Sequence, residues 1–480
     1  MLGLANLFKY HKATLIFIVL SCALYLLFGY GLARTESTKL LLLYVALFIF
    51  AFQIIKWSGF HFRLLVIASI VFRLLFLFAI PNLSQDFYRF IWDGRMILEG
   101  LNPYLYTPDS FILNDKFPFE QAQELYNGMG ALSASHFTNY PPLNQLCFTI
   151  AALFSGKSVL GSVVVMRLMI ITADIGTLYF GKKLLERLKI PSKRISWYIL
   201  NPFIIIELTG NLHFEGVMIF FLVWSLYLLH CDKWKWAAVV LACSISVKLI
   251  PLMFLPFFFW WFIQNLKENV IANEMKQSVS NEKIASSRVP RNDVFKLISF
   301  YVIVGITTLL LFLPFFSMEF INNYTETVGL WFVNFEFNAS VYYLARAIGY
   351  AITGYNEIAI IGKTLPVVSL VIILGFSFLK KDNTIPKLAT SILLAFACYL
   401  FLSTTVHPWY IATLVILCVF TNYRFPLVWS LVIVLSYLAY SNASNNENLW
   451  IIALEYVVVF SVFIWEIFQK KKAASLLAAP

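Results

Sequence analysis

The amino-acid sequence predicts an all-α protein that crosses a membrane many times. Hydrophobic residues make up 60% of the chain and aromatic residues 18%, whereas charged residues make up only 13%. Soluble domains are about half apolar and about a quarter charged. Runs of about 20 apolar residues, the length that crosses a bilayer, recur along the whole chain. The net charge of +11 is spread between these runs, so it indicates membrane topology and gives no support for nucleic-acid binding.

The apolar runs give about 14 expected transmembrane helices. Two further apolar segments, 141–156 and 340–353, are expected to lie on the surface or to re-enter the membrane. Counting 141–156 as a span would place the basic stretch KKLLERLKIPSKR (182–194) outside, which the positive-inside rule disfavours. The expected spans are 13–31, 39–56, 62–81, 159–181, 195–209, 217–231, 236–249, 251–265, 294–314, 358–379, 388–405, 409–422, 425–440 and 449–468.

The distribution of basic residues predicts which loops face each side. With the N-terminus inside, the basic stretches become cytoplasmic, including the polar loop 266–292 and the tail 469–480. The first apolar run lacks a convincing cleavage site and more spans follow it, so we expect an anchor and not a cleaved signal peptide. The segments then expected outside are 82–158, 210–216, 317–340 and 404–409.

The six cysteines lie in or beside apolar runs and form no CxxC pair. This placement favours small packing residues over disulfides or metal ligands.

The stretch PNLSQDFYRFIWDGRMILEGLNPYLYTP (81–108) concentrates charged and aromatic residues. Helical spacing places Asp86, Arg89 and Asp93 on one side, and Gly100 should end the helix. We expect this amphipathic helix to lie at the membrane surface and to present carboxylates just outside the bilayer. Asp86 is a candidate general base, although a helix-capping role is an equal alternative. Asp93 is a candidate acceptor contact or a structural ion-pair partner.

Three polar residues follow this helix, Arg95 at its end and Asn102 and Tyr104 just beyond it. They are candidates for holding a sugar or a phosphate, although such residues are common in loops at membrane surfaces.

The segment NPFIIIELTGNLHFEG (201–216) carries Glu207, His213 and Glu215 at an expected helix end and turn. Ionisable residues at membrane depth are costly, so they suggest function. A lone HxE lacks a third metal ligand, so a hydrogen-bonded pair that holds substrate is favoured over zinc. The alternative is a satisfied turn at the lipid–water boundary.

Two later positions are candidates. Lys248 lies in an apolar run and either extends to lipid headgroups or neutralises a lipid phosphate. In HPWY, Trp409 and Tyr410 fit an aromatic belt, whereas His407 favours a substrate contact. Tyr410 is kept as a substrate-binding candidate beside it.

No Walker motif, dinucleotide-binding fingerprint or zinc-finger spacing is present. The motifs SQDFYRFIWDGRMILEGLNPY, YPPL, NPFIIIELTGNLHFEG, SVKLIPLMFLP and HPWY, in this order, resemble the polytopic lipid-linked sugar transferases of the GT-C fold. The strongest resemblance is to bacterial polyprenol-phosphate-mannose-dependent mannosyltransferases. It covers residues 62 to 410.

The resemblance implies a GT-C-type catalytic module at 62–468, preceded by an additional transmembrane hairpin at 1–61. Asp86 takes the position of the family's catalytic base, at the head of the first exterior loop, although Asp93 remains an alternative. His213 and Glu215 correspond to a later His-x-Asp element, with Glu in place of Asp. Lys248 or Arg95 would stabilise the departing lipid phosphate.

The resemblance also implies the reaction and its partners. A hexose, most often mannose, would pass from a polyprenyl-phosphate donor to a glycan or glycolipid acceptor, with inversion at the anomeric carbon. The scheme needs no cofactor and no metal. The protein would lie among the lipids of the bacterial inner membrane with its active site facing the periplasm or exterior. A flippase of lipid-linked sugars and an O-antigen polymerase or ligase remain alternatives.

Overall fold

The computed structural model describes residues 12–57, 61–263, 291–333, 335–380, 384–442 and 445–478, and within these residues all regular secondary structure is helical. Seven of the described helices are long and apolar enough to cross a membrane, or eight if one sharply bent pair counts as a single span. The expected all-α membrane fold is confirmed. The expected count of about 14 spans exceeds what helix length and composition support.

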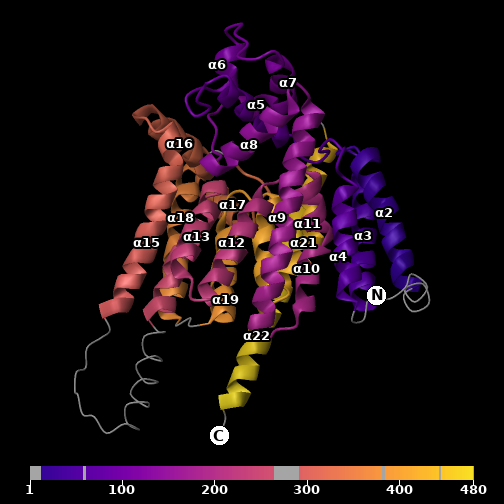
Figure 1. The fold of residues 1–480 in the computed structure, drawn as a ribbon, viewed down its shortest axis with the longest axis vertical. Coiled ribbons are helices and arrows are strands. Elements are labelled where there is room, and N and C mark those ends of the chain that lie inside the picture. Colours follow the sequence, from indigo (N-terminus) through magenta and orange to yellow (C-terminus); the bar gives the residue numbers. More distant parts are fainter. Residues whose placement is uncertain are drawn as a thin grey trace.

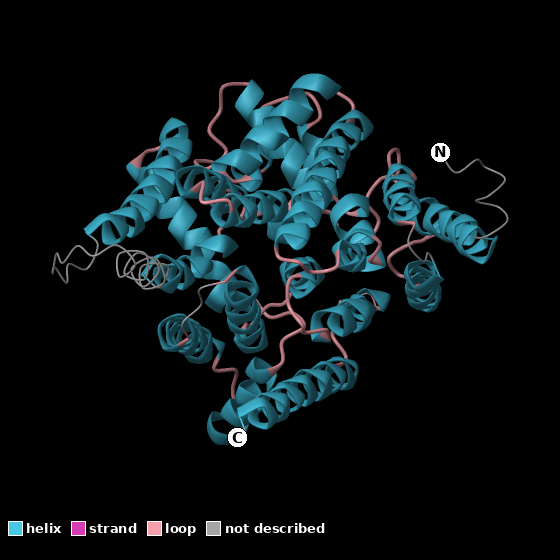
Figure 2. Cartoon of the chain, turned by 60° about the horizontal axis from the view of Figure 1, so that its bottom comes forward, coloured by secondary structure: helices cyan, strands magenta, loops and turns pink. Residues whose placement is uncertain are grey.

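The seven long helices form a bundle together with shorter helices (Figures 1 and 2). They are α2 (Lys12–Gly31), α3 (Ser37–Trp57), α9 (Val159–Arg187), α15 (Arg291–Phe312), α18 (Ile358–Leu379), α19 (Ile385–Leu402) and α22 (Leu449–Ala478).

Shorter helices account for most of the remaining expected spans. The expected span 62–81 forms only the 13-residue α4 (Phe62–Leu74). The others are α13 (Trp234–Val247), η3 (Ile250–Phe257), η5 (Pro408–Ile411), α20 (Ala412–Val419), α21 (Phe425–Val432) and η6 (Ile433–Ser441). The two segments expected on the surface form α8 (Pro142–Ser155) and α17 (Val341–Thr353). The helices η4 (Leu313–Phe315) and α16 (Met318–Val333) lie just before α17 in the chain.

One span is broken. After η1 (Ser192–Ile195) and α10 (Ser196–Ile199), the helices α11 (Pro202–Ile204) and η2 (Ile205–Gly210) meet α12 (Glu215–His230) at a bend of 115°. Backbone groups freed at membrane depth need partners inside the protein. Arg167 of α9 supplies them, because its guanidinium donates to the carbonyl oxygens of Thr209 (2.8 Å), Gly210 (2.9 Å) and Leu77 (3.0 Å).

Residues 82–158 form a layer that we call the helical cap, at the upper end of the bundle in Figure 1. It contains α5 (Asp86–Leu98), α6 (Pro108–Ile112), α7 (Ala122–Ala134) and α8. The C-terminal end of α22 lies at the opposite end of the bundle. The cap and the basic tail are thus on opposite faces, as the charge distribution predicts.

The helix α5 forms where the sequence predicts it and gives way at Gly100, whose φ is +75°. Its position differs from the expectation, because most of its residues from Phe87 to Met96 are buried between α7 and α8. Gly94 explains the close approach, since a Cβ there would lie 2.3 Å from the carbonyl oxygen of Phe148 in α8. The helix is therefore the core of the cap, with most of its surface covered by protein.

Two extended segments, 335–340 and 403–408, meet just below the cap. They form an isolated parallel bridge at Phe337 and Thr405. The Phe337 amide donates to the Thr404 carbonyl (3.1 Å), and the Val406 amide donates to the Phe337 carbonyl (2.8 Å). We call them the crossing segments, and they bring the C-terminal half of the chain to the cap.

Candidate active site

A cavity of about 810 Å³ lies between the helical cap and the crossing segments. Its lining comes from the start of α5, the cap segment before α8, the crossing segments and the residues that precede α22. The sequence-predicted residues in its lining are Asp86, Lys248, His407 and Tyr410. Residues from three distant parts of the chain are thus brought together.

Asp86 is the first residue of α5, and its backbone amide donates to the Ser84 hydroxyl (3.3 Å). Burial raises the pKa of the Asp86 carboxyl to about 6, against the opposing attraction of Lys248 and with a smaller contribution from Glu215. A carboxylate with a pKa near neutrality is a competent general base at physiological pH. Within the described residues Asp86 forms no salt bridge, and it lines the cavity.

Lys248 lies in the junction between α13 and η3. Its Nζ is 3.1 Å from Oε1 of Glu215, which is fully buried at the start of α12. The ammonium also lies 5.1 Å from the centre of the Tyr140 ring. The lysine keeps 20% of its side chain exposed, so it places a positive charge in the cavity while Glu215 holds it from behind.

His213 and His407 both stack on the ring of Trp409. The ring centres are 3.7 Å apart for His213 and Trp409, and 4.6 Å apart for His407 and Trp409, with nearly parallel planes. Behind them, Glu207 Oε2 is 3.8 Å from His213 Nε2 and accepts a hydrogen bond from the Tyr437 hydroxyl (2.9 Å). Trp409 and Tyr437 line the cavity, so Glu207 and His213 support its wall from the second layer.

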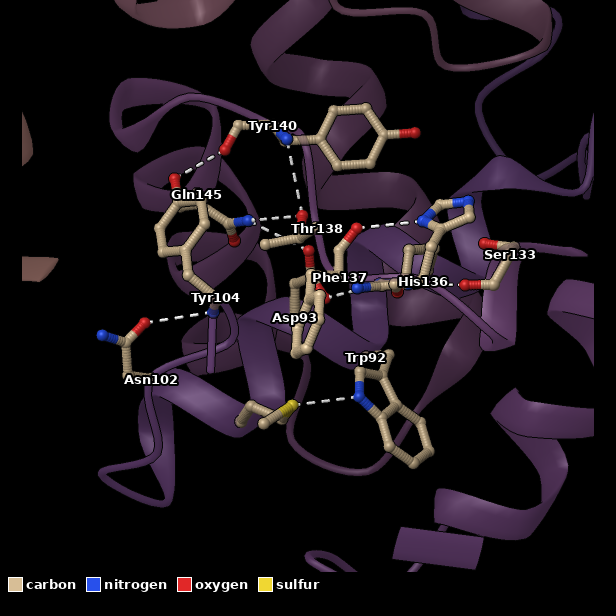
Figure 3. Close-up of polar contacts among 12 residues, drawn as sticks. Trp92, Asp93, Asn102, Tyr104, Ser133, His136, Phe137, Thr138, Tyr140 and Gln145 are labelled. Atoms are coloured by element: carbon tan, nitrogen blue, oxygen red, sulfur yellow. Dashed lines mark hydrogen bonds and ion pairs between the residues drawn. The ribbon is translucent and has the colours of Figure 1, made fainter. Parts of the chain in front are cut away.

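Asp93 does not line the cavity. It is fully buried, with Oδ1 2.8 Å from Arg89 Nε and Oδ2 accepting from Gln145 (2.9 Å). Arg89 also donates to the carbonyl oxygens of Ser133 and His136. Figure 3 shows this network around Asp93, Thr138 and Gln145. The ion-pair alternative is confirmed, and Asp93 fastens α5 to the rest of the cap.

Arg95, Asn102 and Tyr104 also lie away from the cavity. Arg95 is hydrogen-bonded to Gln121, and Asn102 accepts from the Tyr104 amide (3.1 Å). The Tyr104 hydroxyl donates to the Tyr140 carbonyl (2.6 Å), as Figure 3 shows. Arg95 therefore does not lie beside Lys248 in the cavity lining.

The cavity contains two arginines that the sequence interpretation missed. The Arg34 guanidinium lies 4.1 Å from the centre of the Tyr440 ring, and Arg346 is paired with Glu336. Both line the cavity. Arg34 lies in the turn after α2, and Arg346 interrupts the apolar segment 340–353. A single arginine in an otherwise apolar segment could have marked Arg346 as a candidate site residue.

A second cavity of about 180 Å³ adjoins the first, and Tyr140, Lys248 and Tyr410 line both. Its walls are mostly apolar and include Leu249, Ile250, Phe396 and Leu400. A charged group beside Lys248 could therefore carry an apolar chain into the smaller space.

Within the part of the chain that the structure describes, no three His, Cys, Asp or Glu side chains are grouped so as to hold a metal ion. The absence of a metal requirement stays a prediction, to be tested with a chelator.

Comparisons with known proteins identify the family of this chain. Residues 19–264 match the family model described as alpha-(1->6)-mannopyranosyltransferase, N-terminal domain. The matched stretch contains the larger part of α2 and all of α3, together with Asp86, Glu215 and Lys248.

Two curated relatives bear the name Alpha-(1->6)-mannopyranosyltransferase A. The one from Mycobacterium tuberculosis is 21% identical over 193 residues, which is 40% of this chain and 36% of the relative. The one from Corynebacterium glutamicum is 23% identical over 185 residues, which is 38% of this chain and 36% of the relative. The similarity thus spans little more than a third of the length of these relatives.

Proposed function

Since this chain belongs to the alpha-(1->6)-mannopyranosyltransferase family, we propose that it is an integral-membrane glycosyltransferase that transfers mannose from a polyprenyl-phosphate donor. The acceptor is a hydroxyl of a glycan or glycolipid at the membrane face that carries the helical cap. The observation that carries the proposal is the Asp86 carboxyl in a cavity that also holds Lys248, Arg34 and Arg346.

The reaction is a single displacement. The acceptor oxygen attacks the anomeric carbon of the donor sugar, and Asp86 takes the hydroxyl proton as the new C–O bond forms. The bond between the anomeric carbon and the phosphate oxygen breaks, and its electron pair leaves with the lipid phosphate. The transition state has oxocarbenium character, as in glycoside hydrolysis.

The cations support the departure of the phosphate. Negative charge develops on it as the bond breaks, and fixed positive groups lower the energy of that state. Lys248 supplies a point charge, and Arg34 and Arg346 supply guanidinium groups that suit phosphate oxygens. The smaller apolar cavity beside Lys248 has the character needed for the first part of the polyprenyl chain.

Asp86 is favoured over Asp93 as the base because only Asp86 lines the cavity, whereas Asp93 is buried against Arg89. We place the sugar against His407, Trp409 and Tyr410, with Glu207, His213 and Glu215 fixing the wall behind. Arg95, Asn102 and Tyr104 hold the cap in place.

A family name that specifies an alpha-(1->6) linkage has a stereochemical consequence. A single displacement inverts the anomeric centre, so an alpha product requires a beta-linked donor. Transfer from the alpha-linked donor should therefore be undetectable.

The test is transfer of radiolabel from beta-linked polyprenyl-phosphate-mannose to glycolipid acceptors by purified protein in detergent, with and without EDTA. We expect transfer that EDTA does not reduce. Asp86→Asn should lower the rate by at least about 100-fold, the contribution of a positioned base, with an unchanged thermal unfolding profile. Asp109→Asn, which alters a carboxylate outside the cavity, is the matched control.

Wild-type turnover by Asp86→Asn would contradict the assignment of the base. Failure of transfer across a panel of donor sugars, with lipid-linked sugar crossing vesicles instead, would favour the flippase.

A further inference from the structure

A further cavity, of about 540 Å³ and separate from the two already described, lies between the C-terminal end of α9, the N-terminal end of α19 and the end of α20. Four basic residues line it, and none of its lining residues is acidic. They are Lys189, Arg194, Lys380 and Lys387. We call it the basic pocket.

The arginine of the basic pocket is held in place by the protein. Arg194 Nη1 donates to the Thr421 carbonyl (2.9 Å), and Nη2 donates to Asn422 Oδ1 (3.0 Å). Lys189 and Lys380 are exposed at the rim, whereas Ser391 and Thr421 are buried polar residues of the lining. The pocket thus has a fixed cation, mobile lysine side chains and hydroxyl groups, which together match the oxygens of a phosphate group.

Among the described residues, two neighbouring carboxylates are engaged elsewhere. Glu186 is paired with Lys182, and Glu466 accepts hydrogen bonds from the backbone amides of Arg424 and Phe425. Neither carboxylate is part of the pocket lining, so the described lining carries a net positive charge.

The basic pocket lies at the membrane face opposite the catalytic cavity. The helix α19 has 18 residues, so it is roughly 27 Å long at 1.5 Å per residue. Pro386 and Thr390 line the basic pocket near the start of α19, whereas His407 lines the catalytic cavity shortly after its end. Figure 1 shows the cap and the start of α19 at opposite ends of the bundle.

The geometry points to a binding site for a phosphate-bearing anion in the basic pocket, separate from the catalytic cavity. Basic pockets between transmembrane helices bind the headgroups of anionic lipids. The chemistry is shared by a lipid headgroup and by a soluble phosphate, and the experiment separates the two sources. The inference stands independently of the proposed sugar transfer.

The full-length protein in detergent is titrated with phosphatidylglycerol and phosphatidylcholine, and bound lipid is counted by native mass spectrometry. Inorganic phosphate is titrated in a separate calorimetric experiment. We expect saturable phosphatidylglycerol binding that weakens about tenfold in the double variant Lys189→Gln/Lys380→Gln. This follows because each basic residue near a headgroup contributes measurably to binding.

The matched control is Lys182→Gln/Lys183→Gln, which removes the same charge from α9 without altering the pocket lining. Lys189→Arg/Lys380→Arg should retain binding, and thermal unfolding reports whether each variant is folded. Binding of inorganic phosphate with the same loss would assign a soluble anion. The proposal is overturned if the wild-type protein retains phosphatidylcholine as well as it retains phosphatidylglycerol. It is also overturned if phosphatidylglycerol and inorganic phosphate each bind Lys189→Gln/Lys380→Gln as tightly as they bind the wild-type protein.

Discussion

The environment of Asp86 sets the expected dependence of transfer on pH. The folded protein raises the pKa of this carboxyl to about 6, with burial as the main cause. Below that pH the carboxyl is protonated and cannot take the proton from the hydroxyl of the acceptor substrate. We expect kcat/KM to be constant above the pKa and to fall about tenfold per pH unit below it, so that the rate at pH 5 is about one tenth of its maximum.

The measurement is the initial rate of transfer between pH 4.5 and 8 at saturating lipid donor and low acceptor. The residual rate of Asp86→Asn should lack the acid limb. A wild-type rate that increases toward pH 5 would show that the protonated carboxyl acts, which contradicts a general-base role.

Lys248 is the cation whose removal should weaken the stabilisation of the leaving phosphate. We expect Lys248→Gln to lower kcat/KM by about 100-fold, as the loss of one electrostatic contact to a developing charge does. The variant also leaves Glu215 buried and unpaired, which costs about 3–5 kcal/mol of folding free energy. Activity and thermal unfolding therefore have to be measured together.

The double variant Lys248→Gln/Glu215→Gln separates the two effects. It removes the unpaired charge, so its unfolding temperature should return toward that of wild type while activity stays low. Recovery of activity along with stability would show that Lys248 has only a structural role.

At the scale of elements, the broken span depends on Arg167. Its guanidinium satisfies carbonyl oxygens at the bend between η2 and α12, and these would lose their partner in Arg167→Met. Because unsatisfied buried polar groups are costly, we expect a loss on the order of 3 kcal/mol in unfolding free energy. Thermal unfolding in detergent measures this loss.

Arg63→Met is the matched control, since Arg63 is an exposed arginine of α4. It should unfold within a degree or two of wild type. Equal unfolding temperatures for both variants would show that water or another group replaces Arg167 at the bend.

Several elements were predictable because their signals are local. Asp86 to Gly100 has helical spacing and a glycine that ends it, and α5 forms there. The burial of α5 was not predictable, because it depends on the approach of α8 at Gly94. The turn at 210–216 was predicted, but the sequence did not show that the helices on its two sides are too short to be two separate spans and meet at a bend of 115°.

At the scale of the whole molecule, the charge distribution predicts which face carries the cap. We expect Leu113→Cys, whose native side chain is 73% exposed in the cap, to react with a membrane-impermeant maleimide in intact cells. Lys471→Cys, near the end of α22, should react only after the cells are permeabilised. The wild-type protein gives the background from the six native cysteines, and the reversed pattern would contradict the proposed orientation.

The site was only partly predictable from the sequence. One cavity is lined by four of the predicted residues, Asp86, Lys248, His407 and Tyr410. The sequence pointed to them because they are charged residues next to apolar runs or belong to a short motif. Arg95 differs because it lies in the last turn of α5, where it donates to Gln121 and does not reach the cavity. Arg346 was missed because its role depends on the crossing segments, whose pairing leaves no periodic pattern.

The cavity wall has two origins along the chain. Asp86 and Lys248 lie within the stretch shared with the family, whereas Arg346, His407 and Tyr410 lie beyond it. In the proposed mechanism the base comes from the matched stretch, whereas the contacts to the donor sugar come from the part of the chain beyond it. Neither part would form the proposed site alone, so a fragment that ends at residue 264 should be inactive even if it inserts into a membrane.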